Sequence, residues 1–273
     1  MLGSNSINPL LFLKLGGSLI TEKTQTSAAR PETIARIAGE IKAALQARPG
    51  LRLVLGHGSG SFGHVPAKKH GTRQGVSSQE EWTGFYEVWH QASALNRIVI
   101  EEFHRAGIRA ISLPPSAAVT AADGKVLRWD LAPLQSALAR GLLPVVFGDV
   151  VFDTLRGGTI LSTEDLFFHL AGQLHPARIL LAGIEPGVWA DYPQRTQLAK
   201  LVTPSSFADL SGALSGSAAT DVTGGMAAKV KEMLALVGQS DGLDALIFSG
   251  EEPGSIRQAL LGEDLGTRIL GHG

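Results

Sequence analysis

The chain contains no cysteine, which excludes disulfide bonds, thiolate zinc sites and cysteine nucleophiles. Lysine and arginine (24) nearly balance aspartate and glutamate (25), and no strongly basic block occurs, so we do not expect a nucleic acid as the main partner. No apolar run approaches the length of a membrane span, and residues 1–10 lack the basic start and apolar centre of a signal peptide. We therefore expect a cytoplasmic protein without a membrane partner. A small anionic ligand is compatible with this composition, because its site needs only a few local cations.

Short apolar runs alternate with helical patterns along the 273 residues. The strand-like runs are Leu11–Leu15, Leu51–Leu55, Ile108–Leu113, Leu143–Phe147, Ile179–Ala182 and Ala245–Ser249. The helical patterns are Pro31–Ala47, Gln79–Arg105, Leu131–Arg140, Glu164–Gln173 and Gly225–Val237. Strands separated by helices predict an α/β fold, with parallel strand pairing and helices on both faces of the sheet. We also expect a hairpin tip at Asp153–Thr159 and an irregular surface excursion over residues 190–218.

Three glycine-rich clusters have the character of anion-binding sites. One strand-like run leads into Gly56–His64, which holds four glycines, two serines and two histidines. Another ends in Lys14 and Leu15 and leads into Gly16–Ser18, although Lys14 alone is equally explained as a snorkelling edge lysine. Far downstream a glycine pair opens a helical pattern, and Lys229 follows one turn later. Glycine permits close backbone approach, and exposed amides at turns and helix N-termini bind anions, so together the clusters predict a polyphosphate and a second phosphate held side by side.

Aromatic residues make up only 6% of the chain, yet four of them fall within eight positions of the longest helical pattern. These are Trp82, Phe85, Tyr86 and Trp89. Their spacing is typical of a stripe that faces the hydrophobic core. The alternative is that they form a wall of an apolar pocket near the His64 segment, and the spacing does not separate the two interpretations.

Four motifs together resemble the amino acid kinase superfamily, namely Lys14–Ser18, His57–His64, Gly148–Val150 and Thr220–Met226 followed by Lys229. The Ser-Phe-Gly-His ending of the second motif is similar to the isopentenyl phosphate kinase branch and differs from the acetylglutamate, aspartate and uridylate kinases. The resemblance covers nearly the whole chain, including the Gly-Thr-Arg-Ile sequence at Gly266–Ile269.

This resemblance implies an open αβα sandwich with a mainly parallel central sheet, in one domain over residues 1–273. A lobe of about residues 1–178 would hold the phosphate acceptor, a lobe of about 179–273 would hold ATP, and two chains would form a homodimer. The implied reaction transfers phosphate from ATP to isopentenyl phosphate, giving isopentenyl diphosphate for isoprenoid synthesis. Because the acceptor is already an anionic oxygen, the task is mainly positioning and charge stabilisation.

The resemblance also assigns residues to the reaction. The implied catalytic residues are Lys14, Lys23, His64 and Lys229. The implied ATP-binding residues are Lys14, Gly16, Gly17, Ser18, Gly60, Glu164, Gly187, Gly225 and Lys229. The implied acceptor contacts are Ser59, Gly60, His64 and Gly148, with Trp82, Phe85, Tyr86 and Trp89 as candidates for the tail pocket. Mg²⁺ would bridge ATP oxygens, and we assign no protein residue to the metal.

Two departures from the family pattern leave alternatives open. The run Ile184–Trp189 lacks both aspartates that the family usually carries there, so contacts to the base or ribose are in doubt. Glu164 stands near a family carboxylate position, but it is equally explained as a charge at a helix N-terminus. A kinase of another small phosphate or phosphonate, similar to fosfomycin kinase, is the first alternative function. A non-catalytic nucleotide-binding protein on the same fold is the second.

Overall fold

The computed structural model describes residues 9–22, 24–214, 225–240 and 242–272. Lys23 and the Thr220–Gly224 part of the third glycine cluster lie outside the described residues. The roles that the sequence predicts for them are therefore not placed by the structure.

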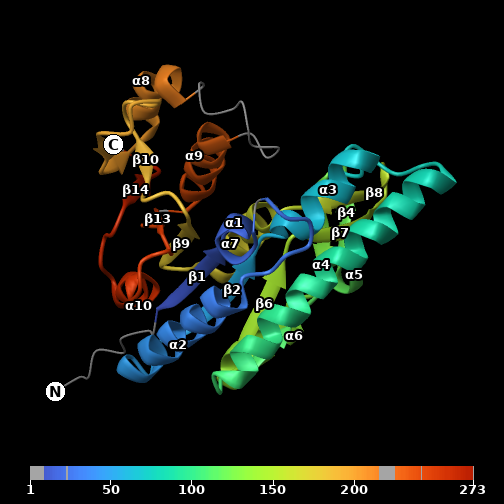
Figure 1. Ribbon diagram of the computed structural model, residues 1–273, viewed down its shortest axis with the longest axis horizontal. Helices are drawn as coiled ribbons and strands as arrows, with labels where there is room; N and C mark the ends of the chain where they lie inside the picture. Colours follow the sequence, from blue (N-terminus) through green and yellow to red (C-terminus); the bar gives the residue numbers. More distant parts are fainter. Residues whose placement is uncertain (1–8, 23, 215–224, 241, 273) are drawn as a thin grey trace.

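In the described part of the chain, eight strands form the main sheet in the order β12, β14, β13, β9, β1, β2, β6 and β3 (Figure 1). Their bounds, in that order, are Leu201–Val202, Thr267–Leu270, Asp244–Ser249, Arg178–Gly183, Leu10–Leu15, Arg52–His57, Leu143–Phe147 and Ala110–Ser112. Neighbouring strands run parallel except β13 and β14, which run antiparallel. The predicted mainly parallel sheet is confirmed. The strands β12 and β14 at one edge are additional to the prediction.

Helices cover both faces of this sheet, because alternate residues of its strands point to opposite sides. One face carries α2 (Pro31–Ala47), α4 (Gln79–Arg105) and α10 (Ser255–Leu261), and the other carries α6 (Ala132–Ala139), α7 (Thr163–Leu174) and α9 (Gly225–Val237). In β1, Leu11 and Leu13 join the core beneath α2 and α4, whereas Leu10 and Phe12 join the core beneath α7 and α9. The α/β sandwich is thus confirmed, with five of these helices at the predicted places.

Two smaller β elements lie beside the main sheet. A four-stranded sheet has the order β5, β4, β7 and β8, with bounds Lys125–Trp129, Val119–Ala122, Asp149–Asp153 and Gly157–Leu161. The predicted hairpin between β7 and β8 is confirmed, and the Asp153 carboxylate holds its tip by accepting the amides of Leu155 and Arg156 at 2.9 Å. A short ribbon pairs β10 (Val188–Trp189) with β11 (Leu198–Ala199).

Two sequence-based expectations are wrong. The glycine content of Gly56–His64 predicts a turn, but β2 continues to His57, and α3 (Gly60–His70) begins within the segment and places His64 inside a helix. Glycine signals a helix N-terminus as readily as a turn, and the small residues that follow hide the helical period. The expected irregular excursion over 190–218 contains β11, β12 and α8 (Pro204–Leu214) where the structure describes it. Strands of two residues are too short to show any periodicity.

The first two glycine clusters meet backbone to backbone. The short helix α1 (Gly17–Ile20) and α3 begin side by side, and a Cβ atom added to Gly17 would lie 2.4 Å from the amide nitrogen of Gly60. Gly60 has a φ of +48°, and a Cβ atom there would lie 2.7 Å from the carbonyl oxygen of Gly17. Thr21 joins the two turns, since its hydroxyl donates to that carbonyl at 2.7 Å and accepts the Ser61 amide at 3.0 Å. Only glycine fits at this contact.

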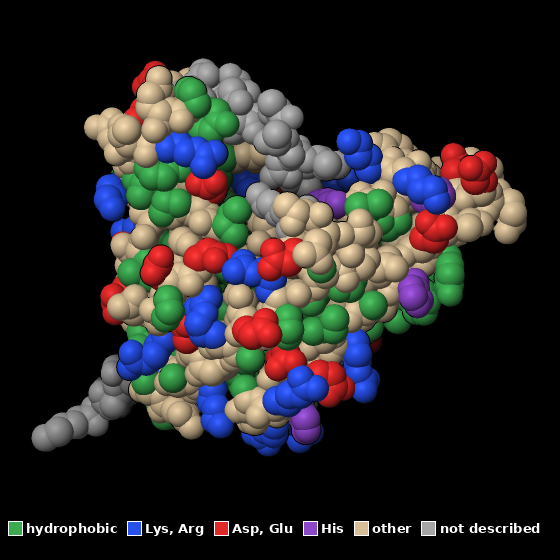
Figure 2. Space-filling model, in the orientation of Figure 1, with side chains coloured by type: hydrophobic (Ala, Val, Ile, Leu, Met, Phe, Trp, Pro, Cys, Tyr) green, Lys and Arg blue, Asp and Glu red, His purple; other side chains and the backbone are tan. Residues whose placement is uncertain are grey.

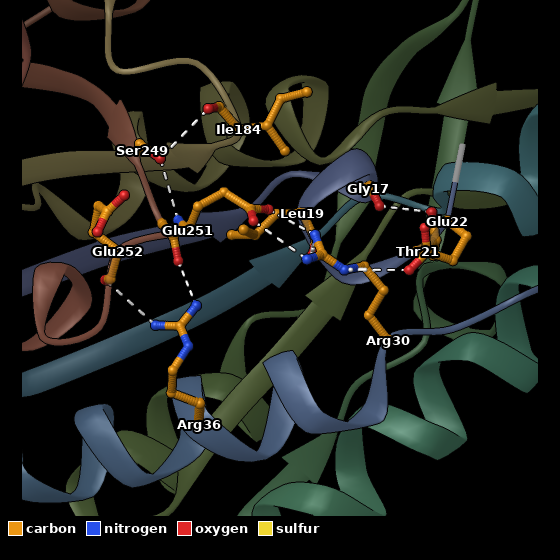
Figure 3. Close-up of polar contacts among 11 residues, drawn as sticks. Gly17, Leu19, Thr21, Glu22, Arg30, Arg36, Ile184, Ser249, Glu251 and Glu252 are labelled. Atoms are coloured by element: carbon orange, nitrogen blue, oxygen red, sulfur yellow. Dashed lines mark hydrogen bonds and ion pairs between the residues drawn. The ribbon is translucent and has the colours of Figure 1, made fainter. Parts of the chain in front are cut away.

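A polar network connects α1 to the loops that follow β9 and β13 (Figure 3). The Arg30 guanidinium donates to the Glu251 carboxylate at 2.6 and 3.2 Å and to the Leu19 carbonyl at 3.1 Å. The Ser249 hydroxyl accepts the Glu251 amide at 3.2 Å and donates to the Ile184 carbonyl at 3.4 Å. The first glycine turn is therefore fixed against the C-terminal strands.

A pair of glycine substitutions tests the backbone contact. Gly17→Ala should lower the free energy of unfolding by about 1–3 kcal/mol, because the new methyl group forces two backbones apart. Gly39→Ala is the matched control, since nothing lies within 4 Å of a Cβ atom at this exposed position in α2. It should raise the free energy of unfolding by about 0.5–1 kcal/mol through helix propensity. Urea unfolding of both variants measures the two changes, and an unchanged stability in Gly17→Ala would contradict the close contact.

Candidate active site

One cavity of about 1920 Å³ lies at the carboxyl ends of the central parallel strands. Its lining includes Gly16 after β1, Gly58 after β2, Gly148 after β6 and Gly183 at the end of β9. Figure 2 shows the molecule hollowed between its C-terminal part and the α3 side, with basic and histidine side chains beside the hollow. Ligands of open α/β sheets bind at this edge, so the cavity is the candidate site.

The structure brings most of the sequence-predicted residues to this cavity. Its lining includes Lys14, Gly16, Gly17, Ser18, Ser59, Gly60, His64, Gly148, Glu164, Gly225 and Lys229. Three glycine clusters that are far apart in the sequence therefore share one space. Gly187 and the four aromatic residues of α4 do not line it, and these exceptions have separate causes.

Lys14 and Glu164 form an ion pair at the centre of the site. Lys14 lies on β1, a central strand between β9 and β2, so the interpretation as an edge lysine is wrong. Glu164 lies in the first turn of α7, which Ser162 caps by accepting the Asp165 amide at 3.1 Å. Burial raises the pKa of Glu164, but the charge and hydrogen bond of Lys14 and the charge of Lys229 hold this pKa below its usual value. Glu164 is thus an ionised carboxylate that holds the Lys14 ammonium in the cavity.

Gly187 serves the fold rather than the cavity lining. A Cβ atom there would lie 2.6 Å from the Thr267 hydroxyl, which accepts the Val188 amide at 2.8 Å. The expected contact of Gly187 with ATP is therefore not supported by its position. Its neighbours Glu185 and Trp189 do line the cavity, and the Trp189 indole donates to the Glu185 carboxylate at 3.0 Å. Because they directly follow β9, their position in the sequence indicates that they belong to the site. The absence of the two family aspartates obscured this indication.

The aromatic residues on α4 either pack in the hydrophobic core or lie exposed on the surface. The Phe85 ring is buried against Trp82 and Phe152, at centroid distances of 5.1 and 5.4 Å. Tyr86 and Trp89 are 58% and 39% exposed. The expectation that these side chains wall the tail pocket is thus not met, because the helix turns them toward the core or the solvent.

Smaller side chains supply the apolar part of the cavity lining. We call Ala67, Val76, Val88 and Ile160 the apolar wall. They belong to one small hydrophobic cluster, and Phe85 lies in the same cluster. Val88 is three residues after Phe85 on the same helix, so the stripe pointed to the correct helix face but not to the correct residue.

A buried histidine lies beneath the second glycine turn. The Asn96 side-chain amide donates to Nε2 of His57 at 3.0 Å, and the Ser112 hydroxyl donates to the Asn96 carbonyl at 2.6 Å. Nδ1 of His57 lies 3.0 Å from the Gly58 carbonyl oxygen. Burial lowers the pKa of His57 to about 4, the hydrogen bond to Gly58 acts in the opposite direction, and the Lys14 charge lowers the pKa further. The sequence singled out this residue only as part of a motif.

In the described residues, no three histidine, aspartate or glutamate side chains gather into an arrangement that could hold a metal ion. The carboxylates of the cavity are instead spread among basic groups. Glu232 on α9 also lines the cavity, and burial together with the charges of Glu164 and Asp165 raises its pKa.

A model of the amino acid kinase family matches residues 9–249. The chain therefore belongs to the amino acid kinase family. It is 35% identical over 270 residues to the isopentenyl phosphate kinase of Methanothermobacter thermautotrophicus, covering 96% of this chain and 99% of that protein. It is 37% identical over 256 residues to the isopentenyl phosphate kinase of Haloferax volcanii, covering 90% and 98%.

Solved structures give the same result for the fold. An isopentenyl phosphate kinase structure that is 31% identical superposes with a TM-score of 0.80, covering 95% of this chain and 99% of the other. N-acetylglutamate synthase from Neisseria gonorrhoeae, at 17% identity, superposes with a TM-score of 0.66 over 98% of this chain and 62% of the other. At that identity the likeness shows a shared fold alone.

The buried histidine gives a prediction about stability and pH. Unfolded histidine titrates near pH 6.5, so between about pH 6.5 and 4 the unfolded chain binds a proton that folded His57 does not. Stability is therefore lost as the pH falls through this window, by on the order of 3 kcal/mol. Asp149 acts in the opposite direction over an overlapping window, because burial raises its pKa to about 6.

A substitution at His57 separates its contribution to the pH dependence of stability from that of Asp149. The free energies of unfolding of the wild type and His57→Asn, measured in urea, should differ most near pH 7. The difference should shrink by on the order of 3 kcal/mol on approaching pH 4, since only the wild type loses the histidine contribution. Parallel pH curves for the two proteins would show that His57 is not buried in its neutral form.

Proposed function

We propose that the chain is an ATP-dependent isopentenyl phosphate kinase, which transfers the γ-phosphoryl group of ATP to the phosphate of isopentenyl phosphate. The observation that carries the proposal is one cavity that is lined by Lys14, Lys229, His64 and the apolar wall. The named activity of the relatives, which match along nearly the whole chain, supports the same function.

The polar half of the cavity suits phosphoryl transfer. Lys14 and Lys229 would lie against the β- and γ-phosphates of ATP, and Glu164 positions Lys14 without neutralising the whole site. The helix N-termini at Gly17 and Gly60 would direct amides to the transferring group. These groups stabilise charge that is shared between donor and acceptor oxygens, which is the main requirement of this chemistry.

The α3 side of the cavity suits an anionic acceptor. His64 lines it, and Lys68 lies one helical turn further along the same face. An imidazole N–H donates to a phosphate oxygen in either charge state when the tautomer is suitable. His64 would therefore bind the acceptor phosphate, and its counterpart at the other end of the acceptor would be the apolar wall.

The nucleotide would occupy the side formed by Gly225, Lys229 and the run after β9. Mg²⁺ would be held mainly by ATP oxygens and supply positive charge there. Among the described residues the Glu232 carboxylate suits an indirect contact to it, because burial and the nearby Glu164 raise its pKa and a cation relieves that repulsion.

We further propose a cytoplasmic homodimer whose chain divides at about residue 178 into an acceptor lobe and an ATP lobe. The course of the chain supports the division, since the first two glycine clusters precede β9 and Lys229 follows it. None of the described helices has the length and apolar character needed to cross a bilayer.

Product formation with a panel of acceptors tests the function. ADP release should depend on isopentenyl phosphate and should be much weaker with fosfomycin or with no acceptor. Only isopentenyl phosphate has a hydrocarbon tail long enough to pack against the apolar wall. Lys14→Met should lose on the order of a hundredfold in turnover, the usual effect of removing one charge-stabilising donor. Lys125→Met, at an exposed position on β5, is the control and should leave turnover unchanged.

The panel also decides between the alternatives. Faster turnover with fosfomycin would replace the proposed acceptor by a small phosphonate. Tight ATP binding without turnover on any acceptor would indicate a non-catalytic nucleotide-binding protein.

Shortening the apolar wall should change the preferred length of the acceptor tail. Val88→Ala should raise kcat/KM for a longer prenyl phosphate relative to isopentenyl phosphate by about tenfold, since one methylene in an apolar pocket is worth about 1–3 kcal/mol. Tyr86→Ala, two residues earlier on the same helix but exposed to solvent, should leave the ratio unchanged. Equal ratios in both variants would place the tail elsewhere.

A further inference from the structure

His57 lies outside the proposed chemistry, yet it forms a continuous chain of hydrogen bonds that ends at the second glycine turn. Its ring is fully buried and stacks on Phe147, with centroids 5.3 Å apart and planes 6° apart. The chain runs from the Ser112 hydroxyl through Asn96 to Nε2 of His57, and from Nδ1 to the Gly58 carbonyl. A polar chain in the core is costly compared with apolar packing, so its position under the cavity calls for a reason.

The hydrogen bonds define which ring nitrogen carries the proton. The Ser112 hydroxyl donates to the Asn96 carbonyl oxygen, which leaves the Asn96 amide group to donate to Nε2. Nε2 is then an acceptor, and Nδ1 carries the proton that is donated to the Gly58 carbonyl oxygen. One neutral tautomer satisfies every group in the chain.

The bond to Gly58 sets the orientation of the next amide. In a planar trans peptide the carbonyl of Gly58 and the N–H of Ser59 point in opposite directions. Because the carbonyl points down to the buried ring, the Ser59 N–H points up, to the side on which Ser59 lines the cavity. Within the described part of the chain, neither the Ser59 amide nor the adjacent Gly60 amide donates to a protein group.

This amide lies close to the lysine of the first cluster. In the pairing of β1 with β2, Leu15 stands opposite His57 and Lys14 opposite Gly56. Gly58 is fixed to β1 as well, since its amide donates to the Leu15 carbonyl at 3.0 Å. An anion that contacts Lys14 is thus within reach of the Ser59 amide. The group expected beside Lys14 is the γ-phosphoryl group.

We propose that His57 is a positioning residue, which holds the Gly58–Ser59 peptide so that the Ser59 amide donates to the γ-phosphoryl group of ATP. This inference rests on the proposed function only in that the ligand is ATP, and it does not depend on which acceptor is used. Asn96 acts through His57 by fixing its tautomer.

Two variants separate the two hydrogen bonds of the ring. In His57→Asn the side-chain amide nitrogen takes the place of Nδ1 and keeps the donor to Gly58, but the acceptor for Asn96 is lost. In His57→Gln the longer side chain reaches the place of Nε2 and keeps an acceptor for Asn96, but the donor to Gly58 is lost. Titration calorimetry with MgATP and with MgADP then reports on the γ-phosphoryl contact alone.

His57→Gln should weaken MgATP binding by about tenfold or more, the effect of losing one hydrogen bond to a charged group, and should change MgADP binding by less than about twofold. His57→Asn should retain most of the MgATP affinity even where its thermal stability falls. In the wild type, a long-range ¹H–¹⁵N correlation spectrum at neutral pH should show protonated Nδ1.

Equal losses for MgATP and MgADP, a larger loss in His57→Asn than in His57→Gln, or protonated Nε2 in the wild type would each overturn the proposal. These outcomes are independent of the acceptor panel. Inactivity toward isopentenyl phosphate with an intact difference between MgATP and MgADP would remove the proposed function and leave the role of His57 in place. Turnover of isopentenyl phosphate, with equal losses of MgATP and MgADP affinity in His57→Gln, would support the proposed function and remove the role of His57.

Discussion

The backbones of Gly17 and Gly60 approach so closely that a single Cβ atom on either would overlap the other chain segment. This contact brings the N-termini of α1 and α3 together at the carboxyl ends of β1 and β2. Gly17 and Gly60 both line the cavity there, and the N-terminus of a helix is a favourable position for a phosphate group. The network of Arg30 and Thr21 around the contact and the buried His57 below it hold the same two turns from other directions.

Charge in the site is arranged around this contact. Lys14 extends from a central strand into the cavity, where an unpaired ammonium would carry a high desolvation cost, and the Glu164 carboxylate compensates for it. His57 is close enough to Lys14 to be affected by its charge, and it is neutral because burial lowers its pKa. The core below the cavity therefore adds oriented dipoles rather than a second cation. A polyphosphate would meet its positive charge on the cavity surface, where Lys229 and His64 also lie.

The sequence predicted the central strands and five covering helices because their apolar runs are long and regular. It also identified Lys14, Glu164, His64 and Lys229, which the cavity brings together. It did not predict α3, because glycine marks turns and helix N-termini alike. It did not predict the apolar wall either, because the four aromatic residues are the more prominent pattern on the helix that carries Val88. It gave no sign of the hydrogen-bond chain under Gly58, since Asn96 and Ser112 are separated from His57 by long stretches of sequence and meet only through the packing of α4 against β2 and β3.

The run after β9, which lacks the two aspartates of the family pattern, is held in place by its backbone. Gly187 is needed where the chain passes Thr267, and the backbone of Val188 is tied to the same threonine, so the path of the run is fixed by β14. Ile184, Glu185 and Trp189 line the cavity from this path, and the Trp189 indole donates to the Glu185 carboxylate. On the proposed assignment of this side to the nucleotide, side-chain contacts here could change while the two glycine turns keep their geometry. In the proposed arrangement, the steric requirement for glycine falls on Gly17 and Gly60. The base and ribose contacts would then fall to side chains of the run after β9.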